Sequence, residues 1–270
     1  MEISICSYSF HRALRDGKQD MFQYITASKE LGATQLEPWS GHFVVTPETA
    51  GQAPLLDTEA GAAYVQKIKA AAAEVGMPFG CIAVDGAHIY EEDPETRQAN
   101  ARRAEQWLAV VAELGARQMR IDSGYRADDW PDDVFDIIVK GYEELIAKAK
   151  EKGVEVVIEN HWGPSKHPEN AIKILEAVDG LGFLFDTNNW AEGKQEQAWE
   201  MCAKYATATH VKTYQFDADG NDPTVNLSKA INLLVDAGYD GCWGIESTPR
   251  NGQEYENARQ TVELIRRILG

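Results

Sequence analysis

Four residues with carboxylate or imidazole side chains recur at intervals of 24 to 36 residues in the second half of the chain, each at or near the end of a short apolar run: Glu159, Asp186, His210 and Glu246. Carboxylates brought together in a low-dielectric site repel one another and take up protons unless a cation is present. Oxygen ligands with one imidazole favour Mn²⁺, Mg²⁺ or Co²⁺, and catalytic Zn²⁺ accepts the same ligands. We therefore expect these four residues to bind one divalent metal ion, with Mn²⁺ as the first choice.

A six-coordinate ion held by four protein ligands would keep about two positions for a substrate with adjacent oxygen atoms, such as a hydroxy-ketone. The alternative interpretation is structural. A single acidic residue at the end of a strand is often a solvated loop residue or the N-cap of the next helix, as Asp186 would be, and His210 could be a buried core histidine. The choice between these interpretations depends on whether the fold brings the four residues together.

The elements that must position these residues alternate along the whole chain. Short β-rich runs predict strands at residues 3–7, 33–37, 79–84, 117–122, 154–159, 182–186, 208–214 and 242–247. Amphipathic runs rich in Ala, Glu and Lys predict helices near residues 18–31, 57–75, 94–114, 132–152, 167–179, 194–205, 226–237 and 252–269.

Eight strands separated by helices predict a single (β/α)8 TIM barrel, an α/β fold of eight parallel strands, over residues 1–270. An open doubly wound sheet is the alternative, but no G-x-G-x-x-G motif follows the first strand. In a barrel, the carboxyl ends of all strands open on one face, so the four residues would converge there. We expect long loops on this face at residues 38–56 and 124–131.

Composition excludes several classes of function. The chain has 26 Lys and Arg against 43 Asp and Glu, a net charge of −17, which disfavours nucleic acids and anionic membranes. Its four cysteines are scattered singly, as expected of reduced thiols, and the N-terminus has no basic and apolar export signal. We expect a soluble cytoplasmic protein with a small carbohydrate substrate. The sequence leaves open whether the protein forms a homo-oligomer.

The stretches VVIENHWG, FLFDTNNW, ATHVKTYQFDADGN and DAGYDGCWGIES resemble the xylose isomerase-like TIM-barrel superfamily, in particular its sugar phosphate isomerase/epimerase branch. The resemblance implies that Glu159, Asp186, His210 and Glu246 hold one divalent metal ion. It also implies, as in the ketose 3-epimerases of the superfamily, that Glu159 and Glu246 exchange the substrate proton. Many members carry D-x-x-H after the sixth strand, whereas this chain has Asp186-Thr187-Asn188-Asn189.

The chemistry implied is a sugar isomerase or epimerase that transfers a proton α to a carbonyl through a metal-stabilised enediolate. Two alternatives remain open: a metal-dependent lyase or dehydratase of a keto-sugar, keto-inositol or oxidised C-glycoside, and a non-catalytic sugar-binding barrel. His161, two residues after Glu159, is a candidate base or substrate contact and opens routes to elimination as well as isomerisation.

Further candidate substrate contacts follow other strands. The rings of Trp39, Trp162 and Trp190 could offer apolar faces to a sugar, although packing of barrel loops explains each of them, taken singly, slightly better. Asp122 ends the fourth strand, and the nearby Arg120 is expected to form a structural salt bridge. The remaining candidate substrate contacts are polar: Glu37, His88, Asn189 and Lys212.

Overall fold

The computed structural model describes residues 1–270 and contains eight strands, each within two residues of its expected position. The eighth helical unit also ends where expected, close to the C-terminus. The strands are β1 (Ile3–Cys6), β2 (Gln35–Glu37), β3 (Cys81–Val84), β4 (Gln118–Ile121), β5 (Glu155–Glu159), β6 (Gly182–Asp186), β7 (Ala208–Thr213) and β8 (Trp243–Ser247).

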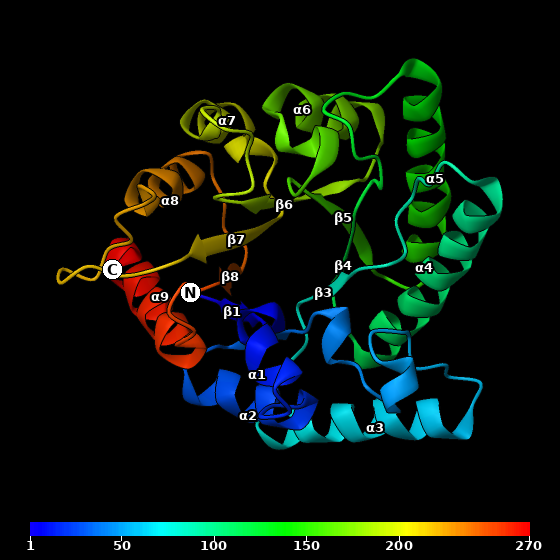
Figure 1. The fold of residues 1–270 in the computed structure, drawn as a ribbon, viewed down its shortest axis with the longest axis horizontal. Coiled ribbons are helices and arrows are strands. Elements are labelled where there is room, and N and C mark those ends of the chain that lie inside the picture. The colour runs from blue at the N-terminus through cyan, green and yellow to red at the C-terminus, as the bar shows by residue number, and fades with distance from the viewer.

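The strands form one parallel sheet in the order β2-β1-β8-β7-β6-β5-β4-β3. Its two end strands are joined by bridges between Leu36 and Phe79 and between Trp39 and Ala83. The amide of Gly80 donates to the carbonyl of Leu36 at 2.8 Å across this seam. The sheet therefore closes on itself with the helices outside it (Figure 1). This confirms the TIM barrel, and the open doubly wound sheet is wrong.

Each strand is followed by a helical unit, and one short helix, α1 (His11–Arg15), was not expected from the sequence pattern. Helices α4 and α5 start where expected, and the other six start one to three residues later. In three of these the capping residue stands outside the helix: the Asp20 side chain accepts from the amide of Gln23, and Thr58 and Asn226 cap in the same way. The other helices are α2 (Met21–Glu30), α3 (Glu59–Glu74), α4 (Pro94–Leu114), α5 (Asp132–Lys150), α6 (Pro168–Ala177), α7 (Gln195–Cys202), α8 (Leu227–Asp236) and α9 (Glu254–Leu269).

The main hydrophobic core lies between the sheet and the surrounding helices and includes 59 buried residues. A separate cluster fills the inside of the barrel with small and medium side chains: Cys81, Val157, Leu184 and Ala208. The last three lie two residues before Glu159, Asp186 and His210, so by alternation they share the inward face with them. This apolar layer supports the polar groups above it.

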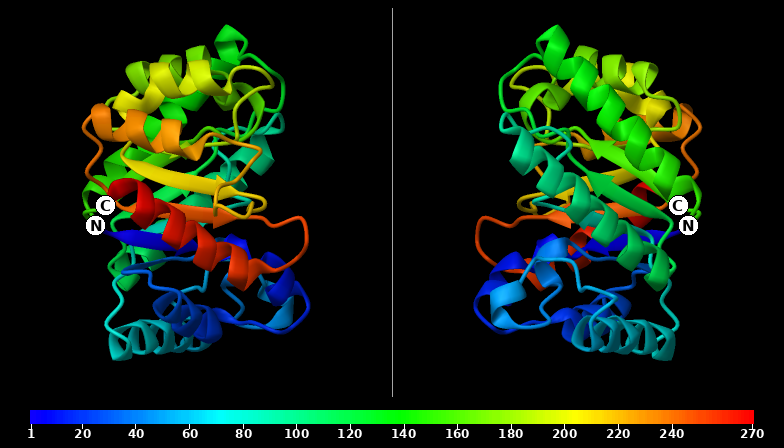
Figure 2. Two further views of the ribbon diagram at one scale, coloured as in Figure 1. Left: turned by 90° about the vertical axis from the view of Figure 1, so that its left-hand side faces the viewer. Right: turned by 90° about the vertical axis from the view of Figure 1, so that its right-hand side faces the viewer.

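The two chain ends lie at the same end of the barrel, where the strands begin (Figure 2). The opposite end carries the loops that follow the strands, including residues 38–58, which contain the 3-10 helices η2 (Ser40–His42) and η3 (Pro47–Thr49). Because the strands end at this opposite end of the barrel, the expected ligand residues must meet there, away from the termini.

None of the helices combines the length and the apolar character needed to cross a membrane.

Candidate metal and substrate site

Four neighbouring strands bring the four expected ligand residues together. Glu159, Asp186, His210 and Glu246 each offer a ligand atom within 4.8 Å of the others, and all four are buried. Asp186 and His210 are direct partners in the β6–β7 register. The Nδ1 atom of His210 lies 3.3 Å from Glu159 Oε1, 3.2 Å from Glu246 Oε2 and 3.9 Å from Asp186 Oδ2. The structure thus places the imidazole among three carboxylates.

The unsatisfied oxygens of this cluster fit a cation. Asp186 Oδ2 and Glu159 Oε2 are buried and make no hydrogen bond, although Arg120 Nε lies 3.2 Å from Glu159 Oε2 as an ion-pair partner. A buried carboxylate oxygen without a donor is costly unless a positive charge stands nearby. Three carboxylates and one imidazole are also the ligands that hard divalent ions accept. The residues therefore fit a divalent metal ion, and the binding of one stays a prediction.

Two cationic side chains of the protein itself surround the cluster. The ammonium of Lys212 lies 2.6 Å from Glu246 Oε1 and 3.7 Å from Asp186 Oδ2. The guanidinium of Arg120 lies 2.8 Å from Asp85, 3.2 Å from Asp122 and 3.2 Å from Glu159. Arg120 forms the salt bridge expected from sequence, and one of its three partners belongs to the cluster. These cations lower the cost of burying the carboxylates.

The site perturbs the pKa values of its members in opposite directions. Burial raises the pKa of Asp186 to about 6, although Lys212 acts against this shift. Burial also disfavours charge on His210, but the carboxylates of Glu37 and Glu159 raise its pKa well above the ordinary value. For Glu246, the cost of burial is outweighed by Lys212 and His210, which hold its pKa well below the ordinary value. Without a metal ion, the surrounding carboxylates therefore favour the protonated form of His210.

Glu37 lies against the edge of the His210 imidazole that faces away from the cluster. Its Oε1 atom is 2.7 Å from His210 Nε2, and the hydroxyl of Ser4 donates to its Oε2 atom at 2.5 Å. A Cβ on Gly244 would come within 2.8 Å of the same Oε2 atom, so the glycine makes room for this carboxylate. The sequence predicted Glu37 as a substrate contact. In the structure its carboxylate lies where it can orient the imidazole of His210.

A cavity of about 370 Å³ opens beside the cluster at the ends of the strands. Of the residues expected from sequence, Trp39, His161, Lys212 and Glu246 line it, together with Arg120. Sequence reasoning missed several others: three lie one or two residues after a strand, where the rule applied to Asp186 would have found them, and two lie in α1, which the sequence pattern did not predict. These residues are Tyr8, His11, Arg12, Asp85 and Thr248.

His161 is held at the cavity by a carboxylate. Its Nδ1 atom lies 3.1 Å from Asp122 Oδ2, and the indole of Trp162 donates to the same oxygen at 3.2 Å. Burial acts to lower the pKa of His161, but the charges of Glu159 and Asp122 raise it to about 9. The imidazole side chain keeps 33% of its surface exposed, so it can meet a bound molecule.

Asn189 connects two members of the site. Its amide nitrogen donates to Glu159 Oε1 at 3.1 Å, and its amide oxygen accepts from Lys212 Nζ at 3.1 Å. Its backbone amide donates to Asp186 Oδ1 at 2.9 Å. The asparagine that stands in place of the D-x-x-H histidine therefore orients a glutamate and a lysine of the site. Contact between Asn189 and a substrate stays a prediction.

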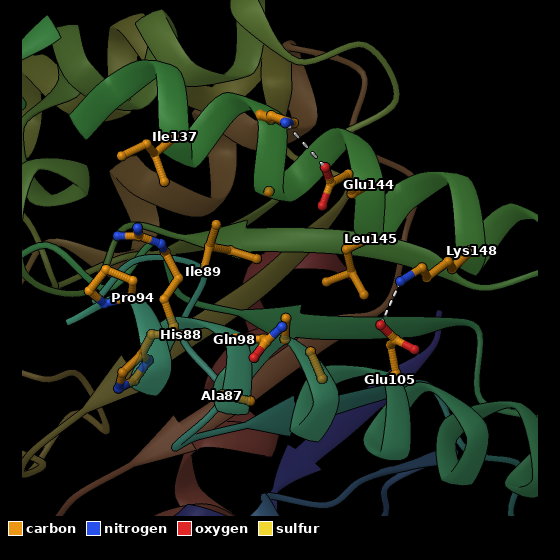
Figure 3. A pocket seen from close by; sticks show the side chains of 15 residues that line it. Ala87, His88, Ile89, Pro94, Gln98, Glu105, Ile137, Glu144, Leu145 and Lys148 are labelled. Atoms are coloured by element: carbon orange, nitrogen blue, oxygen red, sulfur yellow. Dashed lines mark hydrogen bonds and ion pairs between the residues drawn. The ribbon is translucent and has the colours of Figure 1, made fainter. Parts of the chain in front are cut away.

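Five expected substrate contacts do not line the cavity, namely Glu37, His88, Trp162, Asn189 and Trp190, and two of these lie outside the barrel. Trp190 is 8% exposed and packs on Phe183 and Phe185, on the outer side of β6, as the loop-packing alternative expected. His88 lies at the end of a separate groove of about 390 Å³ between α4 and α5, outside the barrel (Figure 3). Its ring meets the edge of Trp162 with centroids 5.2 Å apart. His88 thus packs against Trp162 from outside the barrel.

A family model described as a xylose isomerase-like TIM barrel matches residues 25–268. The chain belongs to this family. The resemblance seen in the sequence is thereby confirmed for nearly the whole barrel. A sequence search of curated proteins gave no match.

Solved structures of other xylose isomerase-like barrels superpose on this family member over almost their whole length. The 3-keto-D-glucoside 4-epimerase of E. coli is 16% identical, with a TM-score of 0.72 over 92% of this chain and 95% of its own. A probable 3-DHS dehydratase from Bacillus anthracis is 15% identical, with a TM-score of 0.74 over 98% and 99%. A xylose isomerase-like protein from Mycobacterium smegmatis, solved with magnesium, is 17% identical, with a TM-score of 0.71 over 100% and 98%. At these identities the likeness shows a shared fold.

The Glu37–His210 contact predicts an effect on metal affinity. We expect Glu37→Ala to weaken Mn²⁺ binding about 10- to 100-fold, because the imidazole loses the acceptor that fixes its orientation. Glu37→Gln, which keeps an acceptor oxygen, should weaken binding less. Isothermal titration with Mn²⁺ measures both, and Glu155→Gln, at the opposite end of β5, is the control. Unchanged affinity in Glu37→Ala would contradict this role.

The raised pKa of His210 predicts that metal binding releases protons. Since the pKa of His210 lies well above its ordinary value without metal, an ion that takes the imidazole must displace a proton. Affinity for Mn²⁺ should therefore rise with pH through neutrality, because fewer protons compete with the ion for the imidazole as the pH rises. Titrations in buffers of different ionisation enthalpy measure the number of protons released. Binding that is independent of pH and buffer would show that His210 is not a ligand.

Proposed function

We propose that this protein is a divalent-metal-dependent isomerase or epimerase of a sugar or sugar derivative. The observation that carries the proposal is the buried cluster of Glu159, Asp186, His210 and Glu246 beside a cavity of about 370 Å³. When bound, a divalent ion would polarise the substrate carbonyl and make the neighbouring C–H group more acidic. The sugar epimerase among its structural neighbours supports the same class of reaction.

Glu246 is the proposed base. It is the cluster carboxylate that lines the cavity, so it can reach the carbon next to a bound carbonyl. Lys212 holds its Oε1 atom at 2.6 Å, which keeps the carboxylate ionised and oriented. In the proposed reaction Glu246 takes the substrate proton, and Lys212, which also lines the cavity, donates a hydrogen bond to a sugar oxygen.

Glu159 is the proposed partner of Glu246 in an epimerisation. The two glutamates belong to β5 and β8, on either side of β6 and β7, so they approach the cluster from different directions. Asn189 and Arg120 hold the two oxygens of Glu159 at 3.1 and 3.2 Å. A proton removed by one glutamate and returned by the other would arrive on the opposite face of the substrate carbon. Return by Glu246 to the adjacent carbon of the enediolate, with the hydroxyl proton moving to the other oxygen, would give isomerisation.

A lyase or dehydratase is the second candidate, because His161 also lines the cavity. The Asp122 carboxylate fixes the imidazole through Nδ1, which directs Nε2 to the cavity as an acid for a departing hydroxyl or aglycone oxygen. The elimination balances: a base takes the proton on one carbon, and His161 protonates the leaving group on the next. The probable dehydratase among the neighbours supports this candidate.

Solvent deuterium exchange tests the first candidate. Protein loaded with Mn²⁺ and incubated with a panel of keto-sugars in D2O should place deuterium on the carbon next to the carbonyl without other loss of mass. Asp186→Asn should lose stoichiometric metal and lower exchange at least about 100-fold, because it removes a ligand carboxylate. The control Asp179→Asn, on the exposed loop before β6, should retain both. Metal-free wild type after loading would overturn both enzymatic candidates.

A variant of His161 separates the two candidates. If the reaction is an elimination, His161→Ala should keep its metal but lose about 10²- to 10⁴-fold in turnover, with release of water or an aglycone by the wild type seen by mass spectrometry. If the reaction is isomerisation through Glu246, the same variant should keep deuterium exchange within about tenfold. Full turnover by the variant would remove His161 from the mechanism.

A further inference from the structure

Arg12 presents an unpaired charge to the cavity. Its guanidinium lines the cavity yet forms no ion pair or hydrogen bond with the protein, whereas its backbone amide and that of Ala13 donate to Glu254 at 2.9 and 3.0 Å. These backbone contacts fix α1. The Nη1 atom lies 3.2 Å from the position that a Cβ on Gly252 would occupy, so the guanidinium rests against the β8–α9 loop.

The other charged groups of the cavity already have partners. Arg120 is matched by three carboxylates, and Lys212 by Glu246 and Asp186. The carboxylate of Asp85 is matched by Arg120 at 2.8 Å and by the indole of Trp39 at 2.7 Å. The guanidinium of Arg12 is therefore the cation of this cavity that pairs with no carboxylate of the protein, although the chain has a net charge of −17.

Thr248 adds a second free donor from the segment that Arg12 touches. It follows β8 directly and lines the same cavity, and its side-chain hydroxyl forms no hydrogen bond with the protein. The guanidinium fork donates two parallel hydrogen bonds, which match the two oxygens of a carboxylate. A hydroxyl on a neighbouring loop can donate a further hydrogen bond to one of these oxygens. A phosphate carries more charge and three free oxygens, for which this corner supplies only one cation.

We propose that Arg12 and Thr248 form a subsite for a carboxylate carried by the sugar substrate, so that the protein acts on a sugar acid. This proposal depends on the proposed function in one respect: it assumes that the other end of the substrate reacts at the metal cluster. The carboxylate subsite lies on the segments after β1 and β8, and the metal cluster on β5 to β8, so a substrate would be held at both. Recognition of the anionic end would then select the substrate, while the cluster performs the chemistry.

Direct binding measurements test this subsite independently of turnover. The probes are D-fructuronate, D-fructose and D-fructose 6-phosphate, titrated calorimetrically into Mn²⁺-treated wild type, Arg12→Gln, Arg12→Lys and Arg15→Gln. Arg15 is the matched control, because it lies on the same helix with an exposed side chain outside the cavity. We expect the wild type and Arg15→Gln to bind fructuronate about tenfold or more tightly than fructose.

Arg12→Gln should lose this preference while keeping Mn²⁺ affinity, and Arg12→Lys should retain part of it, since an ammonium keeps the charge but not the fork. Equal binding of fructuronate and fructose, tighter binding of the phosphate, no binding of any probe, or a preference that survives in Arg12→Gln would overturn the proposal. Fructuronate selectivity through Arg12 without deuterium exchange or metal binding would instead overturn the proposed function and leave the subsite standing.

Discussion

The concentration of negative charge inside one end of the barrel is the constraint on which the rest of the structure depends. Glu37, Glu159, Asp186 and Glu246 are all nearly inaccessible to solvent. Such carboxylates repel one another and lose hydration, so the site is stable only when cations stand among them. The protein supplies part of this compensation through His210, Lys212 and Arg120, and the oxygens that still lack donors create the place for a divalent ion.

The interior of the barrel is organised around this requirement. A thin apolar layer of Cys81, Val157, Leu184 and Ala208 lies on the inward face below the cluster. Its small side chains support the polar groups without filling the space that Glu37 needs beside His210. The large hydrophobic core lies outside the sheet, against the helices, and can stabilise the fold without entering the site. The outward face of the strands thus packs the core that stabilises the fold, and the inward face carries the residues of the site.

Within the family, the features particular to this chain lie in the shell around the four ligands. Asn189 occupies the place where many members have a histidine, and it orients Glu159 and Lys212 instead of offering a group that exchanges protons at neutral pH. The walls of the cavity come from segments after different strands, such as Tyr8 after β1 and Asp85 after β3. The four ligand residues would fix the type of chemistry, while the residues that line the cavity decide which molecule fits.

The sequence by itself determined the barrel and the convergence of the four ligand residues. Strand and helix periods are local patterns, and parallel strands in a closed sheet all end on one face, so Glu159 and Asp186 could be placed together without coordinates. The sequence did not determine which way the remaining side chains face. Only the tertiary structure placed Glu37 behind His210, Trp190 in the outer core, His88 behind Trp162, and Arg12 beside the cavity without a partner. Those positions depend on the path of irregular loops and on packing between segments far apart in the chain, which no local pattern encodes.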